Sequence, residues 1–110
     1  PEMYVDAGEE IIIKDLTIDQ LELRPMASVS NQPNPWAEFT DLVFEISYSD
    51  RVMIKLYDSN GRIVEVRQVD VVKGLNNVRF NAEDLDASGV IFYDIISSKE
   101  KAQGKMILIK

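Results

Sequence analysis

Large apolar and polar residues alternate in short runs through the middle of the chain. Residues 42–48 place Leu, Phe, Ile and Tyr at every second position, and residues 52–56 repeat the pattern with Lys55 on the polar side. A period of two puts successive side chains on opposite faces of a strand, so each run predicts a half-buried β-strand. Because Ser49 and Asp50 provide a turn between the runs, we expect the two strands to form an antiparallel hairpin.

The segment Asp58-Ser59-Asn60-Gly61 is the strongest turn signal in the chain. Asn and Gly tolerate a positive φ in a type I turn followed by a bulge, which predicts a tight hairpin between residues 52–56 and the next strand. In that next strand, residues 64–67 alternate valine with charged residues, and an apolar patch follows at residues 69–72. The pattern therefore predicts a further strand, with valines on one face and charged residues on the other.

The polar stretch at residues 81–88 separates two further predicted strands. Residues 78–80 alternate again, and Leu85 is the large apolar residue of the loop, so we expect it to insert into the core. Residues 90–96 are apolar on both faces except for Asp94, as is typical of a central strand covered on both sides. We expect this strand to be the most buried element.

The last apolar residues of the chain also alternate, after a predicted charged turn at Ser97 to Gln103. Met106 and Leu108 fall on one face of a final strand, and Ile107 and Ile109 fall on the other. An edge strand that is apolar on both faces favours pairing with a partner.

The first quarter of the chain is rich in acidic residues. Residues 1–24 surround the run Ile11-Ile12-Ile13 and predict one or two strands, which we interpret as the end of a preceding region or a linker. The chain begins at Pro1, without an initiator Met or a basic and apolar leader, so we expect a fragment of a longer protein with any secretion leader upstream.

Two prolines end the next predicted strand. Residues 26–31 are expected to be extended, but Pro33 and Pro35 lack the backbone donor that a strand ladder needs. With the strands that follow, residues 25–110 contain about seven or eight short strands and no convincing helix of two turns. The predicted fold class is an all-β, immunoglobulin-like antiparallel β-sandwich.

Composition limits the classes of function that fit. The chain has 110 residues, of which 45% are hydrophobic, enough for one modest core. Its net charge of −7, from 19 acidic and 12 basic residues, argues against nucleic-acid binding, which needs a positive surface. Its apolar runs are far shorter than the roughly 20 residues of a membrane helix, so we expect no membrane-spanning segment.

Catalytic and metal chemistry find no support in the residues. The chain has no His and no Cys, so the commonest general base and the thiolate nucleophile are missing. Asp58 with its neighbours, or Asp84 with Asp86, offer oxygen atoms for calcium, but neither group has the spacing of an EF-hand loop. We expect no enzyme activity, no metal and no cofactor.

Several residues admit both a structural and a functional interpretation. Gly61 and Gly89 fit turns where a Cβ would be strained, or they contact a partner directly. Lys105 and Lys110 are either solvated charges that discourage aggregation or recognition groups. Trp36, the only tryptophan, either caps the sandwich or stands exposed as a platform for sugar stacking.

Four ordered motifs resemble a known family. They are Asn34-Pro35-Trp36 before a strand, the turn in Leu56–Arg62, the segment Ser88–Tyr93, and Lys105–Lys110 at the end of the chain. In order and spacing they resemble the type A C-terminal sorting domain of the Bacteroidetes type IX secretion system, over about residues 26 to 110. Trp36 stands where Phe is usual, and Ile91 stands where Tyr is common, and both keep a large apolar side chain.

The resemblance implies a secretion address and no enzyme. It implies that residues 25–110 are a sorting domain, attached to a cargo that has reached the periplasm. It also implies recognition by the outer-membrane translocon and a shuttle β-barrel, then removal by a sortase-like protease, with the cargo secreted or kept at the cell surface. The implied recognition residues are Asn34, Pro35, Gly61, Arg62, Gly89, Lys105, Met106, Ile107, Leu108, Ile109 and Lys110.

The terminal strand suggests a physical mode of recognition. A two-faced apolar strand that ends in Lys110 could add to an exposed sheet edge or enter the mouth of a barrel. The alternatives from other classes are an immunoglobulin-like spacer of a surface adhesin and a carbohydrate-binding module that uses Trp36. Deleting Lys105 to Lys110 distinguishes the sorting domain from the spacer. The sorting domain predicts a reporter trapped in the periplasm, and the spacer predicts unaffected export.

Overall fold

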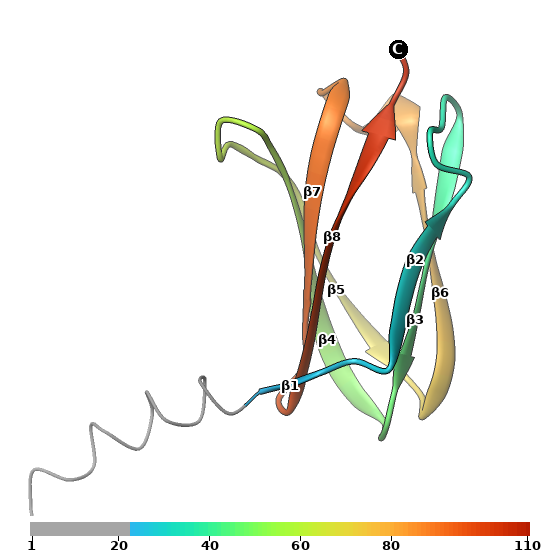
Figure 1. Ribbon diagram of the computed structural model, residues 1–110, viewed down its shortest axis with the longest axis vertical. Coiled ribbons are helices and arrows are strands. Elements are labelled where there is room, and N and C mark those ends of the chain that lie inside the picture. Colours follow the sequence, from blue (N-terminus) through green and yellow to red (C-terminus); the bar gives the residue numbers. More distant parts are fainter. Residues whose placement is uncertain (1–22) are drawn as a thin grey trace, which may run out of the picture.

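The computed structural model describes residues 23–110 as a two-layer β-sandwich (Figure 1). The strands expected before residue 23 lie outside the described residues. Within the described part the elements are β1 (Arg24–Pro25), β2 (Ser28–Gln32), β3 (Phe39–Ile46), β4 (Asp50–Asp58), β5 (Ile63–Val71), β6 (Gly74–Asn81), the 3-10 turn η1 (Ala82–Asp84), β7 (Gly89–Ile96) and β8 (Glu100–Leu108). The all-β, immunoglobulin-like prediction is confirmed.

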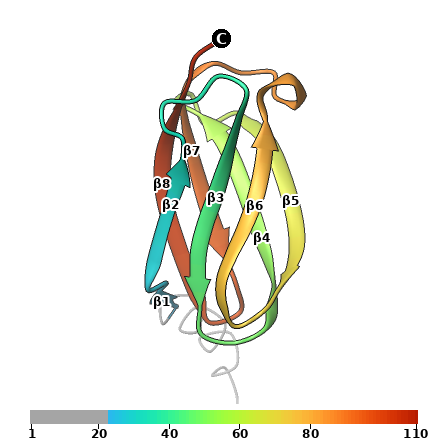
Figure 2. The same cartoon turned by 90° about the vertical axis from the view of Figure 1, so that its right-hand side faces the viewer.

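The chain crosses repeatedly between two sheets. One sheet has the order β1-β8-β7-β4-β5, and the other has the order β2-β3-β6 (Figure 2). The predicted hairpin of residues 42–48 with residues 52–56 is wrong, because β3 pairs with β2 and β6 while β4 pairs with β5 and β7. The inward side chains of β3 from Leu42 to Ile46 and of β4 from Val52 to Leu56 are apolar. Placing the two strands in opposite sheets packs these faces against each other.

The core fills the space between the two sheets. The apolar residues of β3 and β4 that face it are at most 1% exposed, and Leu85 reaches it from the loop after η1 as expected. The fully buried large side chains are Trp36, Leu42, Phe44, Ile46, Ile54, Leu56, Phe80, Leu85, Ile91, Ile95, Met106 and Leu108.

The β4–β5 hairpin forms where the turn signal predicts it. Gly61 has φ +85°, and its backbone N–H donates to the Asp58 carbonyl at 2.9 Å. The register of the two strands then shifts between Leu56 and Tyr57, as in a bulge. The shift aligns Glu65 with the core-facing Leu56, so Glu65 and Arg67 of β5 lie on the inner side of this strand, whereas Asp70 lies opposite the exposed Arg51.

Strand β7 is central in its sheet, but the prediction that it is covered on both faces is wrong. Ile91 and Ile95 face the core and are fully buried, whereas Val90 on the outer face is 40% exposed. The reason is that the three-stranded sheet covers only one face of the five-stranded sheet. The expected charged turn is also shorter than predicted, because β8 already begins at Glu100.

Strand β8 is not the outermost strand of its sheet. It pairs with β7 from Lys101 to Leu108, and the two-residue β1 pairs in parallel with its first residues. The expectation of a simple edge strand is therefore wrong, although β1 covers only a short part of the other side of β8.

Candidate functional site

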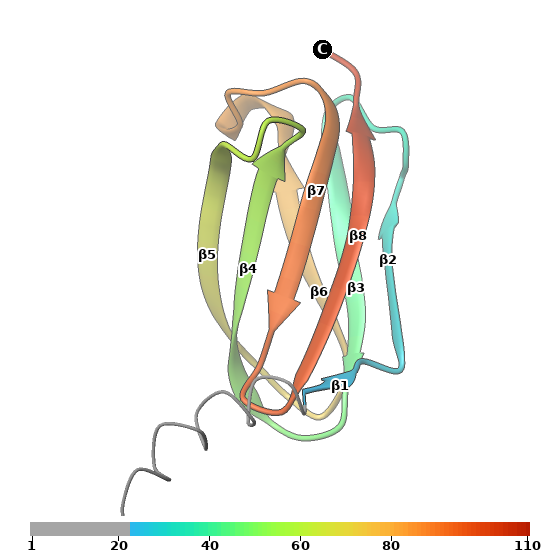
Figure 3. The same ribbon diagram turned by 60° about the vertical axis from the view of Figure 1, so that its left-hand side comes forward.

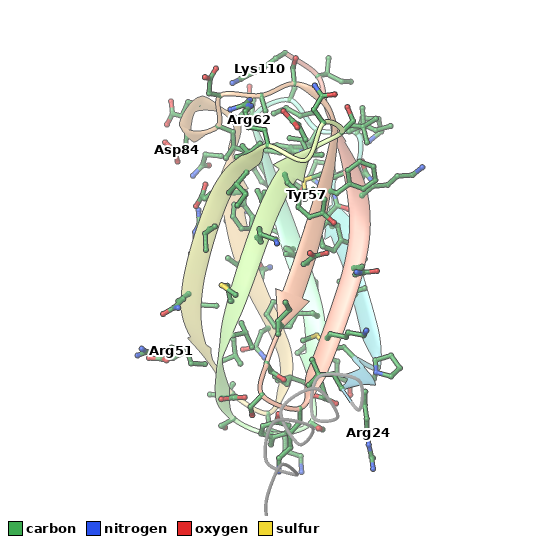
Figure 4. The ribbon with its side chains drawn as sticks, turned by 90° about the vertical axis from the view of Figure 1, so that its left-hand side faces the viewer. Arg24, Arg51, Tyr57, Arg62, Asp84 and Lys110 are labelled. Atoms are coloured by element: carbon green, nitrogen blue, oxygen red, sulfur yellow. The ribbon has the colours of Figure 1, made fainter. Side chains whose placement is uncertain are left out.

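Residues from all four motifs meet at one end of the sandwich, which we call the terminal end. It consists of the connection after β2, the turn between β4 and β5, the loop at residues 82–88, and residues 107–110. Figure 3 shows these connections around the end of β8. In Figure 4, Arg62, Asp84 and Lys110 lie near this end, whereas Arg24 and Arg51 lie near the opposite one.

The Asn-Pro-Trp motif binds the last strand directly. The Asn34 Oδ1 atom accepts a hydrogen bond from the Ile107 N–H at 2.9 Å. The backbone N–H of Trp36 donates to the Ile107 carbonyl at 2.9 Å, and the Trp36 carbonyl accepts from the Ile109 N–H at 2.8 Å. Pro35 is exposed between them and follows a cis peptide bond. The motif therefore bonds to the end of β8 along the strand edge that faces away from β7.

Arg62 connects the β4–β5 turn to the loop before β7. Its Nη2 donates to the Asp86 carbonyl at 2.8 Å, and its Nε lies 3.1 Å from Asp58 Oδ2. Asp58 Oδ1 also accepts from the backbone N–H groups of Arg62 and Asn60 at 2.9 and 3.0 Å. The hydrogen bond from the Arg62 N–H is the main cause that lowers the pKa of Asp58 below its usual value.

The last residue is joined to the same loop. The Lys110 ammonium donates to the Leu85 carbonyl, and the Leu85 side chain itself is 2% exposed in the core. Gly89 opens β7 after this loop with φ +84°, a conformation that side chains with a Cβ rarely adopt. The positive φ values are a sufficient structural reason for glycine at positions 61 and 89, as turn chemistry predicts.

The terminal strand presents one buried and one exposed apolar face. Met106 and Leu108 are at most 1% exposed, so they are core residues. Ile107 is 43% exposed and Ile109 is 59% exposed on the other face. The predicted alternation is confirmed, and of the four apolar residues from Met106 to Ile109 only the two isoleucines have side chains that a partner can reach.

Lys105 lies away from the residues of the terminal end. It is opposite Phe92 in the β7–β8 ladder, on the outer face of the five-stranded sheet. There it borders a shallow hollow of about 270 Å³ together with Tyr57, Phe92 and Gln103. Lys105 and Lys110, which belong to one motif, therefore occupy different surfaces.

The motifs miss one position that the fold requires. Gly104 is opposite Tyr93 in the β7–β8 ladder, and a Cβ at Gly104 would overlap the Tyr93 ring. Burial of that ring raises the pKa of the Tyr93 hydroxyl. A glycine inside a strand pattern is a known signal of close approach by another group, so Gly104 could have been singled out from its sequence.

Other candidate sites are not supported by the geometry. Trp36 is 2% exposed, which agrees with the capping interpretation and contradicts an exposed sugar platform. Among residues 23–110, no group of three or more His, Cys, Asp or Glu side chains is arranged to hold a metal ion. No helix in this part of the chain is long and apolar enough to cross a membrane.

Comparisons with known proteins point to one family. The family model described as the secretion system C-terminal sorting domain matches residues 32–110. No curated protein matches the chain. Among solved structures, a β-glucosidase from Listeria innocua in complex with glucose is similar at 10% identity and a TM-score of 0.41. That match covers 76% of this chain and 16% of the enzyme, so most of the enzyme has no counterpart here.

Proposed function

Because the chain belongs to the family of type IX secretion C-terminal sorting domains, we propose how its sorting signal is read. The family is a class of export signals and not a class of enzymes, and it directs proteins to the cell surface or the medium. We propose that the outer-membrane translocon and a shuttle β-barrel recognise the terminal end while the cargo is in the periplasm. A sortase-like protease then removes the domain.

The observation that carries this proposal is the convergence of the motifs on one folded surface. Asn34 bonds Ile107 across 73 positions of sequence, and Arg62 bonds Asp86 across 24. Segments joined in this way present their exposed groups in a fixed arrangement, which reduces the conformational entropy lost on binding. The folded terminal end, and not a linear peptide, is therefore the proposed signal.

This arrangement changes the expected mode of recognition. A terminal strand that adds to a partner needs free backbone groups, but those of Ile107 are bonded to Asn34 and Trp36. Leaving such groups unpaired costs about 1–3 kcal/mol each where they are buried. We therefore propose contact through the exposed side chains of Ile107, Ile109 and Lys110 while β8 stays in its sheet.

The first test is export of a reporter. Residues 25–110 are fused to a fluorescent protein that is targeted to the periplasm of a host with type IX secretion. Fluorescence is expected at the cell surface or in the medium, and residues 1–110 provide the comparison that sets the domain boundary. Deleting Lys105 to Lys110 should trap the reporter in the periplasm. Normal export of this truncation would favour the spacer interpretation.

The truncation also removes buried residues, so a second variant keeps the fold. Ile107→Ser with Ile109→Ser changes only exposed side chains of the terminal end. Val72→Ser with Leu75→Ser is the matched control, because these residues are 63% and 67% exposed near the opposite end. Loss of export in the first variant alone supports recognition of the terminal end, provided that both variants keep their thermal stability.

Removal of the domain has a separate measurement. Mass spectrometry of the exported reporter should show a product that lacks residues 25–110. An exported reporter of full mass would contradict the proteolytic step and leave the sorting proposal unchanged.

A further inference from the structure

Strand β8 has a short stretch of open sheet edge halfway along its length. One side of β8 pairs with β7 from Lys101 to Leu108. Among residues 23–110, the other side pairs only with β1 at its start and with Trp36 near its end. In an antiparallel ladder, every second residue points its backbone groups to the same side. Gln103 and Lys105 therefore face the same side as Ile107, and within residues 23–110 nothing bonds to their backbone there.

The gap arises from the path of the chain before β3. After β1, the chain leaves β8 and forms β2, which pairs with β3 in the other sheet. It bonds to β8 again at Asn34 and Trp36, which both contact the backbone of Ile107. Figure 3 shows β1 next to the start of β8 and β2 farther up the side of the sandwich. The gap therefore lies between two fixed contacts of the same segment.

The opposite edge of this sheet is protected in a way that the gap is not. On β5, Arg67 points inward, stacks on the Phe80 ring at 4.1 Å and donates to the Arg79 carbonyl at 2.9 Å. Inward-pointing charges of this kind discourage an added strand. The inner side of the gap has instead Ala102 and Gly104, which carry no charge and little bulk.

The outer side of the gap carries two lysines and an aromatic pair, with Asp94 of β7 opposite Gln103 and bonded to the Tyr57 hydroxyl. Lys101 and Lys105 are exposed on either side of Gln103, and neither forms an ion pair with another described residue. Beside them, the rings of Tyr57 and Phe92 stack with centroids 5.7 Å apart and border the 270 Å³ hollow. These charges favour an acidic occupant.

The same charges disfavour a second copy of the chain. Two β8 edges side by side would bring lysines together on one face of the extended sheet, and like charges on neighbouring strands are destabilising. An acidic strand gains two favourable pairs in the same positions. The charge pattern thus selects among the possible occupants of the edge.

We propose that the gap binds an extended, acidic segment of the secretion machinery as an added strand. The segment would exchange backbone hydrogen bonds with Gln103 and Lys105. Its acidic residues, at every second position, would face Lys101 and Lys105, and its small apolar residues between them would face the side of the core. The inference rests on the proposed function for the identity of the partner.

Solution NMR of the 110-residue protein provides the direct test. The probe is a blocked synthetic peptide in which Glu and Val alternate over seven positions, and the control peptide has Lys in place of Glu. The amide signals of Gln103 and Lys105 are expected to shift and to exchange more slowly with the Glu peptide only. Equal binding of both peptides, or shifts confined to β5, would overturn the proposal.

Charge-reversed variants test the selectivity. Lys101→Glu with Lys105→Glu should weaken binding of the Glu peptide roughly fivefold, as expected of two exposed ion pairs. Lys73→Glu is the control at another exposed lysine and should leave the affinity unchanged. Protection of the Gln103 and Lys105 amides without any peptide would mean that another part of the chain, or a second copy, fills the gap, and would overturn the proposal.

Export then separates this inference from the proposed function. With the fluorescent reporter, the double Glu variant should be exported less efficiently than the Lys73→Glu control. Normal export despite lost peptide binding would overturn the role of the gap, while the effect of changing Ile107 and Ile109 would still decide the proposed function.

Discussion

At each end of the sandwich, hydrogen bonds join segments that are far apart in sequence. At the terminal end, Asn34 bonds Ile107 and Arg62 bonds the Asp86 carbonyl. At the opposite end, the Ser47 N–H donates to Glu100 Oε1 at 3.0 Å, across 53 positions. Residues from all four family motifs lie at the terminal end, with Lys105 as an exception on the outer face of the sheet. The contacts that hold the two ends are nevertheless of the same physical kind.

The comparison shows what exposure and bonding alone do not decide. The terminal end exposes Ile107 and Ile109, but Val72 and Leu75 near the opposite end are at least as exposed. An exposed apolar side chain is common on protein surfaces and does not by itself mark a site. Recognition at the terminal end must therefore be tested by changing matched residues at both ends.

The largest effect on stability is expected at the terminal end, from Trp36→Ala. Loss of a buried tryptophan should lower the free energy of unfolding by about 3–5 kcal/mol. Trp36→Phe should cost less, because the buried indole Nε1 has no hydrogen-bond partner among residues 23–110 to lose. Chemical denaturation measures both values. A cost below about 1 kcal/mol for Trp36→Ala would contradict its role in the core.

The second-largest effect on stability is expected at the opposite end, from Glu100→Ala. Glu100 is 9% exposed, and its carboxylate accepts the Ser47 N–H. Glu100→Ala leaves that N–H without its partner and should cost about 1–3 kcal/mol, again measured by denaturation. We expect export of the reporter to stay normal wherever the variant remains folded. Lost export by a stably folded Glu100→Ala protein would show that recognition is not confined to the terminal end.

A smaller effect is expected for the motif residue Asn34. Asn34→Ala removes the acceptor of the Ile107 N–H, an exposed hydrogen bond worth about 1 kcal/mol. Hydrogen exchange at the Ile107 amide should become faster, while the amide of Ile109, which is bonded to Trp36, should change less. Unchanged exchange at Ile107 would contradict this hydrogen bond.

The smallest effect is expected on stability in acid, when one aspartate from each end is replaced. The pKa of Asp58 is lowered mainly by the Arg62 N–H, and that of Asp50 mainly by the Ser98 N–H. Each lowered pKa stabilises the fold above the ordinary aspartate pKa of about 3.9, and the contribution is lost as pH falls through the native value. Asp58→Asn and Asp50→Asn should each reduce the loss of stability below about pH 4, measured by thermal unfolding at several pH values. An unchanged acid profile in both variants would contradict these pKa shifts.

The sequence was most informative where structure depends on neighbouring residues. The alternation in β3, β4 and β8 correctly separated core positions from exposed ones, and Asp58 to Gly61 correctly marked a hairpin. These signals are local, because strand periodicity and turn conformation depend on a few adjacent residues. The four motifs likewise identified the family without any knowledge of the fold.

Only the tertiary structure decided which strands are partners. Alternation shows that a strand has an inner face, but it does not choose between a neighbour in the same sheet and a strand across the core. For this reason β3 and β4 look like a hairpin in sequence and lie in different sheets in the fold. The same non-local pairing joins Asn34 to Ile107 and leaves the backbone of Gln103 and Lys105 open.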